Sequence, residues 1–84
     1  MSGGFSAWKA RAVIRLAQLK RKYAGDEEVC AQLDRLVARL KRLRRRDLNS
    51  FLAELIALSG RVPELLEVVP AEEDAERWLR EGGE

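Results

Sequence analysis

Residues 26–46 read DEEVCAQLDRLVARLKRLRRR, a stretch that combines a helix start signal, a leucine repeat and a dense basic end. Apolar residues recur in it at spacings of four, three, four and three, the pattern of a helix with one buried face. They are Val29, Leu33, Leu36, Leu40 and Leu43. Asp26 can cap the helix, and Glu27 and Glu28 suit the positive end of its dipole. We therefore predict a helix over residues 26–46.

The segment before this stretch predicts a partner helix over residues 6–24, with Ser6 as its N-cap and Gly25 as its stop. Its main apolar side holds Phe5, Trp8, Ala12, Leu16, Leu19 and Tyr23, and a second, weaker side holds Ala10, Val13, Ile14, Ala17 and Ala24. The short turn at Gly25 predicts that the two helices form an antiparallel hairpin. Because a helix that is apolar on two sides is typical of an interface, we expect a dimer or a place in a larger complex.

The rest of the chain predicts three shorter helices, over residues 48–59, 63–69 and 71–81. Thirteen leucines and eleven alanines, with no threonine, favour helices over a sheet. We predict one all-α domain over residues 1–84, a small bundle built on a long helical hairpin plus a third helix and two short C-terminal helices. Residues 1–5 are expected to be a flexible N-terminus and residues 82–84 a frayed tail.

Charge is divided between the two halves of the chain. Residues 1–46 contain thirteen Lys or Arg and four Asp or Glu, a net of +9, whereas residues 47–84 contain three and ten, a net of −7. Such a division points to binding rather than to chemistry.

The densest basic feature is the run KRLRRR at residues 41–46, with five cations in six residues. Arginine offers phosphate oxygens a planar fork of donors, and each neutralised phosphate releases a counterion. Cations also offset the dipole at a helix C-terminus, but one or two would suffice for that. An acidic protein partner and a plain solvated helix end remain alternatives. The predicted binding residues are Arg42, Arg44, Arg45 and Arg46, with contributions from Arg35, Arg39, Lys41, Arg11 and Arg15.

Other classes of site have little support. The chain has no histidine, no nucleophile motif and no glycine loop that could cradle a phosphate, so we expect no catalytic residue, no metal site and no cofactor. The single Cys30 excludes an intramolecular disulfide. Trp8, Tyr23 and Trp78 can stack on bases, but their positions on apolar faces favour the core. With no signal peptide and no apolar run of about 18–20 residues, we expect a cytoplasmic protein that does not contact membranes.

We therefore expect a non-enzymatic accessory protein that contacts the phosphates of DNA or RNA, largely independently of sequence. The alternative is a protein–protein adaptor, or a small subunit of a larger complex, that uses its apolar helix sides and its divided charge. No small-molecule substrate is indicated. An open question is whether the acidic half covers the basic side of the helix at residues 26–46.

Overall fold

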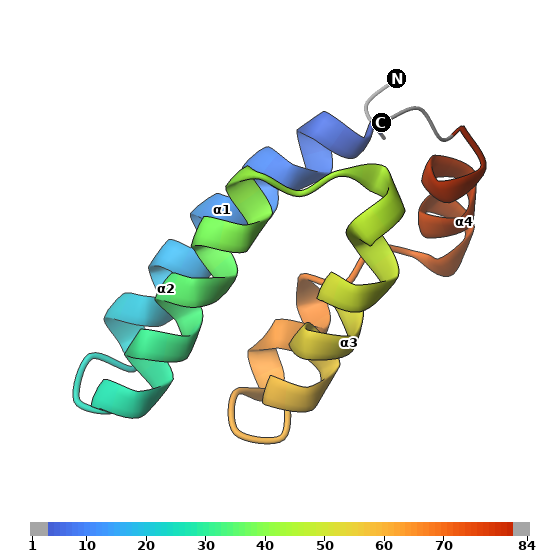
Figure 1. The fold of residues 1–84 in the computed structure, drawn as a ribbon. Helices are drawn as coiled ribbons and strands as arrows, with labels where there is room; N and C mark the ends of the chain where they lie inside the picture. The colour runs from blue at the N-terminus through green and yellow to red at the C-terminus, as the bar shows by residue number, and fades with distance from the viewer. Residues whose placement is uncertain (1–3, 82–84) are drawn as a thin grey trace.

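The computed structural model describes residues 4–81, and in that range the chain forms helices and no strand (Figure 1). The all-α prediction is confirmed. The four α-helices and two short 3₁₀ helices are α1 (Phe5–Lys22), α2 (Glu27–Lys41), η1 (Arg45–Asp47), α3 (Leu48–Leu58), η2 (Pro63–Glu67) and α4 (Glu72–Glu81). The expectations for residues 1–3 and for the tail at 82–84 lie outside the described residues.

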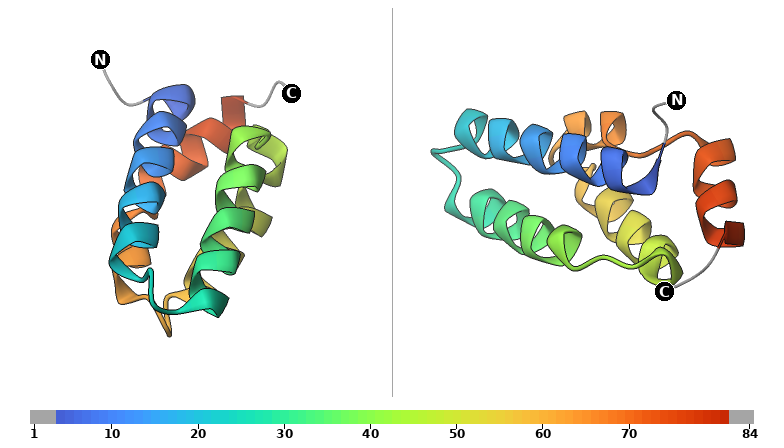
Figure 2. Two further views of the ribbon diagram at one scale, coloured as in Figure 1. Left: turned by 90° about the vertical axis from the view of Figure 1, so that its left-hand side faces the viewer. Right: turned by 90° about the horizontal axis from the view of Figure 1, so that it is seen from above.

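Helices α1 and α2 lie side by side and run in opposite directions (Figure 2). At the turn end, Lys20 Nζ lies 2.7 Å from Asp34 Oδ1. At the other end, Lys9 Nζ donates to the Leu43 carbonyl at 2.9 Å. The predicted cap of α2 is present, because Asp26 Oδ1 accepts from the Val29 amide at 3.1 Å. Helix α3 and η2 pack against this pair, and α4 lies at the end of the molecule where α1 begins.

Helix α2 ends at Lys41 rather than at the predicted Arg46. Leu43 and Leu48 are both buried, yet five residues of continuous helix would place them about 140° apart around the axis. Breaking the helix lets both reach the core. The chain then extends at Arg44, with φ −108° and ψ 157°, and tightens into η1 before α3.

The other helix boundaries shift by a few residues. Helix α1 begins at Phe5, inside the segment expected to be flexible, because Phe5 is buried. Its N-cap is Gly4 rather than the predicted Ser6. Helix α4 starts at Glu72, and the short helix expected over residues 63–69 is a 3₁₀ helix that ends at Glu67.

The core joins the leucine seam of α2 to a cluster of aromatic rings from α1, α3 and α4. All five residues of the seam are buried. Ring centroids in the cluster, which comprises Phe5, Trp8, Phe51 and Trp78, lie 5.6–6.2 Å apart. Trp8 Nε1 also donates to the Val68 carbonyl at 2.8 Å. Trp8 and Trp78 are thus core residues, as predicted, whereas Tyr23 is half-buried.

Candidate nucleic-acid interface

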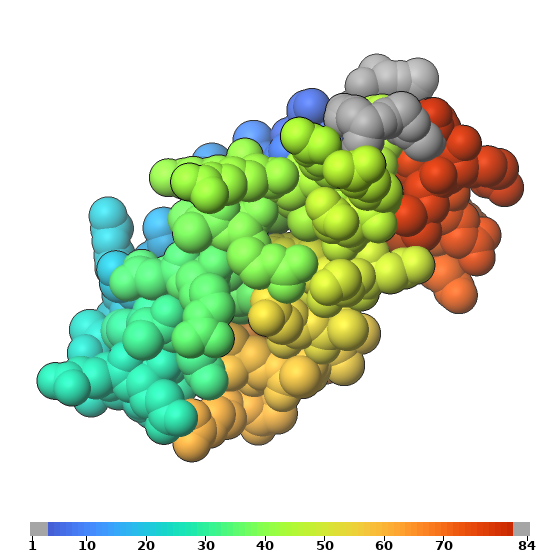
Figure 3. Space-filling view, in the orientation of Figure 1, coloured from blue at the N-terminus to red at the C-terminus, as the bar shows by residue number. Residues whose placement is uncertain are grey.

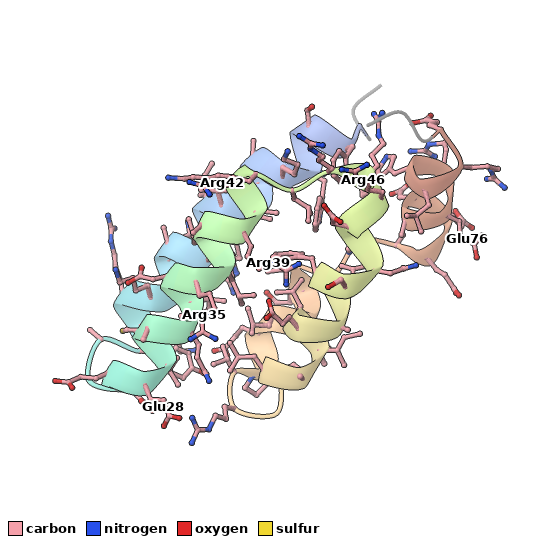
Figure 4. All side chains as sticks on the ribbon, in the orientation of Figure 1. Glu28, Arg35, Arg39, Arg42, Arg46 and Glu76 are labelled. Atoms are coloured by element: carbon pink, nitrogen blue, oxygen red, sulfur yellow. The ribbon has the colours of Figure 1, made fainter. Side chains whose placement is uncertain are left out.

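The basic connection, residues 41–46, links the end of α2 to the start of α3 and carries five of the predicted binding residues. Leu43 takes the inward position in this segment, so its neighbours Arg42 and Arg44 lie outside. Lys41 and Arg46 are also exposed. Figure 4 places Arg42 at the α2 end of the connection and Arg46 at the α3 end. The early end of α2 therefore spreads these charges over a bend instead of along one helix face.

Four cations of the connection have no acidic partner in the described part of the chain. Across residues 4–81, no carboxylate lies within ion-pair distance of Lys41, Arg42, Arg44 or Arg46. A cation without a protein partner keeps its full hydrogen-bonding capacity for an anion from outside. These four side chains form the exposed centre of the candidate interface.

Arg45, the fifth cation, turns toward the protein. Its guanidinium lies 5.4 Å from the centroid of the Phe5 ring, and an amino group lies 3.8 Å from Glu81 Oε1. Its side chain is 31% exposed. Arg45 therefore connects the start of α1 to the end of α4, and its predicted role in binding phosphate is not supported by its position.

Arg39 is also occupied by the protein itself. Its guanidinium donates to Glu54 Oε1 at 2.6 Å and to Ser50 Oγ at 3.4 Å, and it lies 5.7 Å from the centroid of the Phe51 ring. These contacts hold α2 against α3. Arg35 lies about one turn of α2 before Arg39, on the same side of the helix as Arg39 and Arg42, and it remains exposed (Figure 4).

Arg11 and Arg15 lie on another flank of α1 and do not join the basic connection. Lys9 is the residue of this helix that reaches Leu43, and two further residues advance a helix by about 200°. Arg11 and Arg15 instead line a hollow of about 380 Å³ beside residues 67–71 and α4. Arg15 pairs there with Glu67 at 3.0 Å. The predicted contribution of Arg11 and Arg15 to the basic connection is thus not supported by their positions.

The acidic residues of the described range, 47–81, leave most of the basic connection open. Figure 3 shows α4 at one end of the molecule, with α3 between α4 and α2. The acidic side chains Glu72, Glu73 and Glu76 are exposed on α4. Helix α4 touches the connection through the pair of Arg45 and Glu81. The described acidic residues therefore do not cover the exposed basic side chains of this region. These are Arg35, Lys41, Arg42, Arg44 and Arg46.

Sequence reasoning missed Glu64 of η2 and misplaced the partners of the cations that end α1. The sequence by itself predicts a capping network of Lys20, Arg21 and Lys22 with Asp26, Glu27 and Glu28. In the structure Lys22 pairs instead with Glu64, and Lys20 pairs with Asp34. The hydrogen bond from Lys22, followed by the one from Tyr23, lowers the pKa of Glu64 to about 2. These pairs link segments distant in sequence, so no local spacing could have revealed Glu64.

Residues 4–81 contain no group of three or more Cys, Asp or Glu side chains placed to hold a metal ion. No helix in the same range combines the length and the apolar character needed to cross a bilayer. The chain has no significant match among protein-family models, curated proteins or solved structures.

Proposed function

We propose that this protein is a non-enzymatic accessory protein that binds the phosphate backbone of nucleic acid, largely independently of sequence, through its basic connection. The observation that carries the proposal is the exposure of Lys41, Arg42, Arg44 and Arg46 without an acidic partner in the described range. These four cations exceed the one or two that would suffice to offset the dipole at the end of a helix. Phosphate contacts of this kind position a nucleic acid but do not read its sequence.

Salt dependence tests the proposal, because each neutralised phosphate releases counterions. Four phosphate contacts to duplex DNA predict that log K falls against log salt with a slope of about −3.6. Arg44→Ala should make the slope shallower by about 0.9, and Arg44→Ala with Arg46→Ala by about 1.8. Fluorescence anisotropy with a labelled duplex, at several salt concentrations, measures these slopes.

Arg21→Ala is the matched control for this experiment. Arg21 is exposed on α1 and has no ion pair within residues 4–81, so its loss changes net charge equally without touching the connection. Its slope should equal that of the unchanged protein. If Arg21→Ala and Arg44→Ala weaken binding equally, the connection is not the site and general charge attraction explains the binding.

An adaptor is the second candidate function, favoured by the outer side of α1. Ile14 is 59% exposed there, beside the exposed Ala10 and Ala17 on the same side of the helix. An apolar helix side that faces solvent is typical of a surface that packs on a partner or on a second copy. Absence of binding to any nucleic acid at low salt would exclude the first proposal and favour this one.

A further inference from the structure

A groove between α2 and α3 opens on the same side of α2 as Arg39 and Arg42. Its volume is about 370 Å³, within the range of small-ligand sites. Four residues of α2 and three of α3 line it, together with Arg61 from the turn after α3. They are Glu28, Gln32, Arg35, Leu36, Glu54, Ala57, Leu58 and Arg61.

The lining combines apolar side chains with compensated charges. Ala57 is exposed and Leu58 half-buried, which gives the groove apolar surface above the buried Leu36. The two carboxylates already have partners, since Glu28 lies 3.1 Å from Arg61 and Glu54 lies 2.6 Å from Arg39. A neutral, flat group can enter such a groove without desolvating an unpaired carboxylate.

Arg35 adds an anion site at the rim of the groove. It is exposed, and no carboxylate in the described part of the chain pairs with it. Seven residues separate it from Arg42, a rise of about 10 Å along α2. One extended anionic strand can therefore contact both Arg35 and the basic connection.

Gln32 supplies the observation that points to a ligand. Its Oε1 is buried and receives no hydrogen bond in the described structure. Buried acceptors normally have a donor, and an unpaired one lowers stability. Gln32 lines the groove and the terminal torsion of glutamine is soft, so rotation about this torsion can present the oxygen to a donor there. A ligand with an N–H group would satisfy it.

We propose that the groove receives one base of a single-stranded nucleic acid whose phosphates lie on Arg35 and the basic connection. This inference rests on the proposed function. A base has flat apolar faces for Ala57 and Leu58 and, except in thymine and uracil, an exocyclic amino group for Gln32. In a duplex the bases are paired and stacked, and extracting one costs free energy. The protein therefore prefers single strands to duplexes at equal phosphate number.

Three labelled probes of equal length test the groove in anisotropy titrations at one salt concentration: oligo(dC), an abasic strand with the same phosphates, and a duplex. The unchanged protein should bind oligo(dC) about tenfold more tightly than the abasic strand, roughly the effect of one added hydrogen bond with apolar contact. Ala57→Phe fills the groove and should reduce oligo(dC) affinity to that of the abasic strand. Its affinities for the abasic strand and the duplex should not change.

Ala53→Phe is the matched control, because Ala53 is an exposed residue of α3, one turn before Ala57 and outside the groove lining. It should retain the tenfold preference for oligo(dC) over the abasic strand.

Gln32→Leu keeps the groove's shape while removing the acceptor, and it should reduce the preference for oligo(dC) severalfold. Circular dichroism checks that each variant is folded.

Equal affinity of the unchanged protein for oligo(dC) and the abasic strand would overturn the groove proposal while leaving the phosphate-binding function intact. Failure of all three probes to bind would instead contradict the proposed function itself. Binding of cytidine monophosphate as tightly as oligo(dC) would overturn the assignment of the groove to a strand, since the connection would then add nothing.

Discussion

Glu64 shows how a single side chain in the tertiary structure can anchor the end of a helix. Its carboxylate accepts from Lys22 Nζ and, at 2.7 Å, from Tyr23 Oη, so η2 is tied to the last turn of α1. The bonds to the ionised form lower the pKa of Glu64 to about 2, and the same contact raises the pKa of Lys22 and of Tyr23. Ionised Glu64 therefore favours the folded chain.

The stabilisation of the fold by ionised Glu64 should be lost at acid pH. The pKa of Glu64 lies below its unfolded value of 4.5, so its contribution is present above pH 4.5 and is lost as pH falls toward about 2. Glu64→Gln should be less stable than the unchanged protein at pH 7 and equally stable near pH 2. Urea unfolding at a series of pH values measures the difference, and a constant difference down to pH 2 would contradict the assignment.

At the scale of elements, the start and the end of α2 determine where the basic residues lie. Asp26 closes the N-terminus by accepting from the Val29 amide, and the helix stops where Leu43 and Leu48 both need the core. Had the helix continued to Arg46, Arg42 and Arg46 would have shared its face with Arg39. The observed break instead places the exposed cations around a bend.

The cap of α2 can be tested directly. Asp26→Ala removes the acceptor for a backbone amide and should lower the free energy of unfolding by about 1 kcal/mol. Glu27→Ala, an exposed residue in the first turn of the same helix, removes charge from the same end but no cap, and should cost less. Urea unfolding of both variants gives the comparison. Equal losses would mean that the dipole, and not the hydrogen bond, explains the role of Asp26.

At the scale of the whole molecule, an aromatic cluster unites the two ends of the chain. Phe5 and Trp8 of α1 meet Trp78 of α4, with the ring centroids of Trp8 and Trp78 at 5.6 Å. Arg45 covers the Phe5 ring and reaches Glu81 of α4, so the basic connection is supported by the same contacts. A domain of this size has a small margin of stability, and each large buried ring matters.

Removing one ring should test whether α4 belongs to the cooperative core. Trp78→Ala should lower the free energy of unfolding by about 3–5 kcal/mol, a large share of the total for a small domain. Trp78→Phe should cost less, because it keeps most of the apolar contact. Thermal unfolding followed by circular dichroism measures both. An unchanged midpoint for Trp78→Ala would mean that α4 contributes little to the fold.

Local patterns determined the helices, because helix propensity, capping and apolar spacing act over a few residues. The leucine spacing of residues 29–43, the cap at Asp26 and the burial of Trp8 and Trp78 could all be predicted in this way. The end of α2 could not, since it depends on the joint burial of Leu43 and Leu48. The sequence likewise showed an excess of arginines, but the tertiary structure decided which remain available: packing against Glu54 and Phe5 occupies Arg39 and Arg45, while Arg42, Arg44 and Arg46 face solvent. Glu54 and Phe5 are distant in the chain from the arginines that they contact, and no local sequence pattern indicates these contacts.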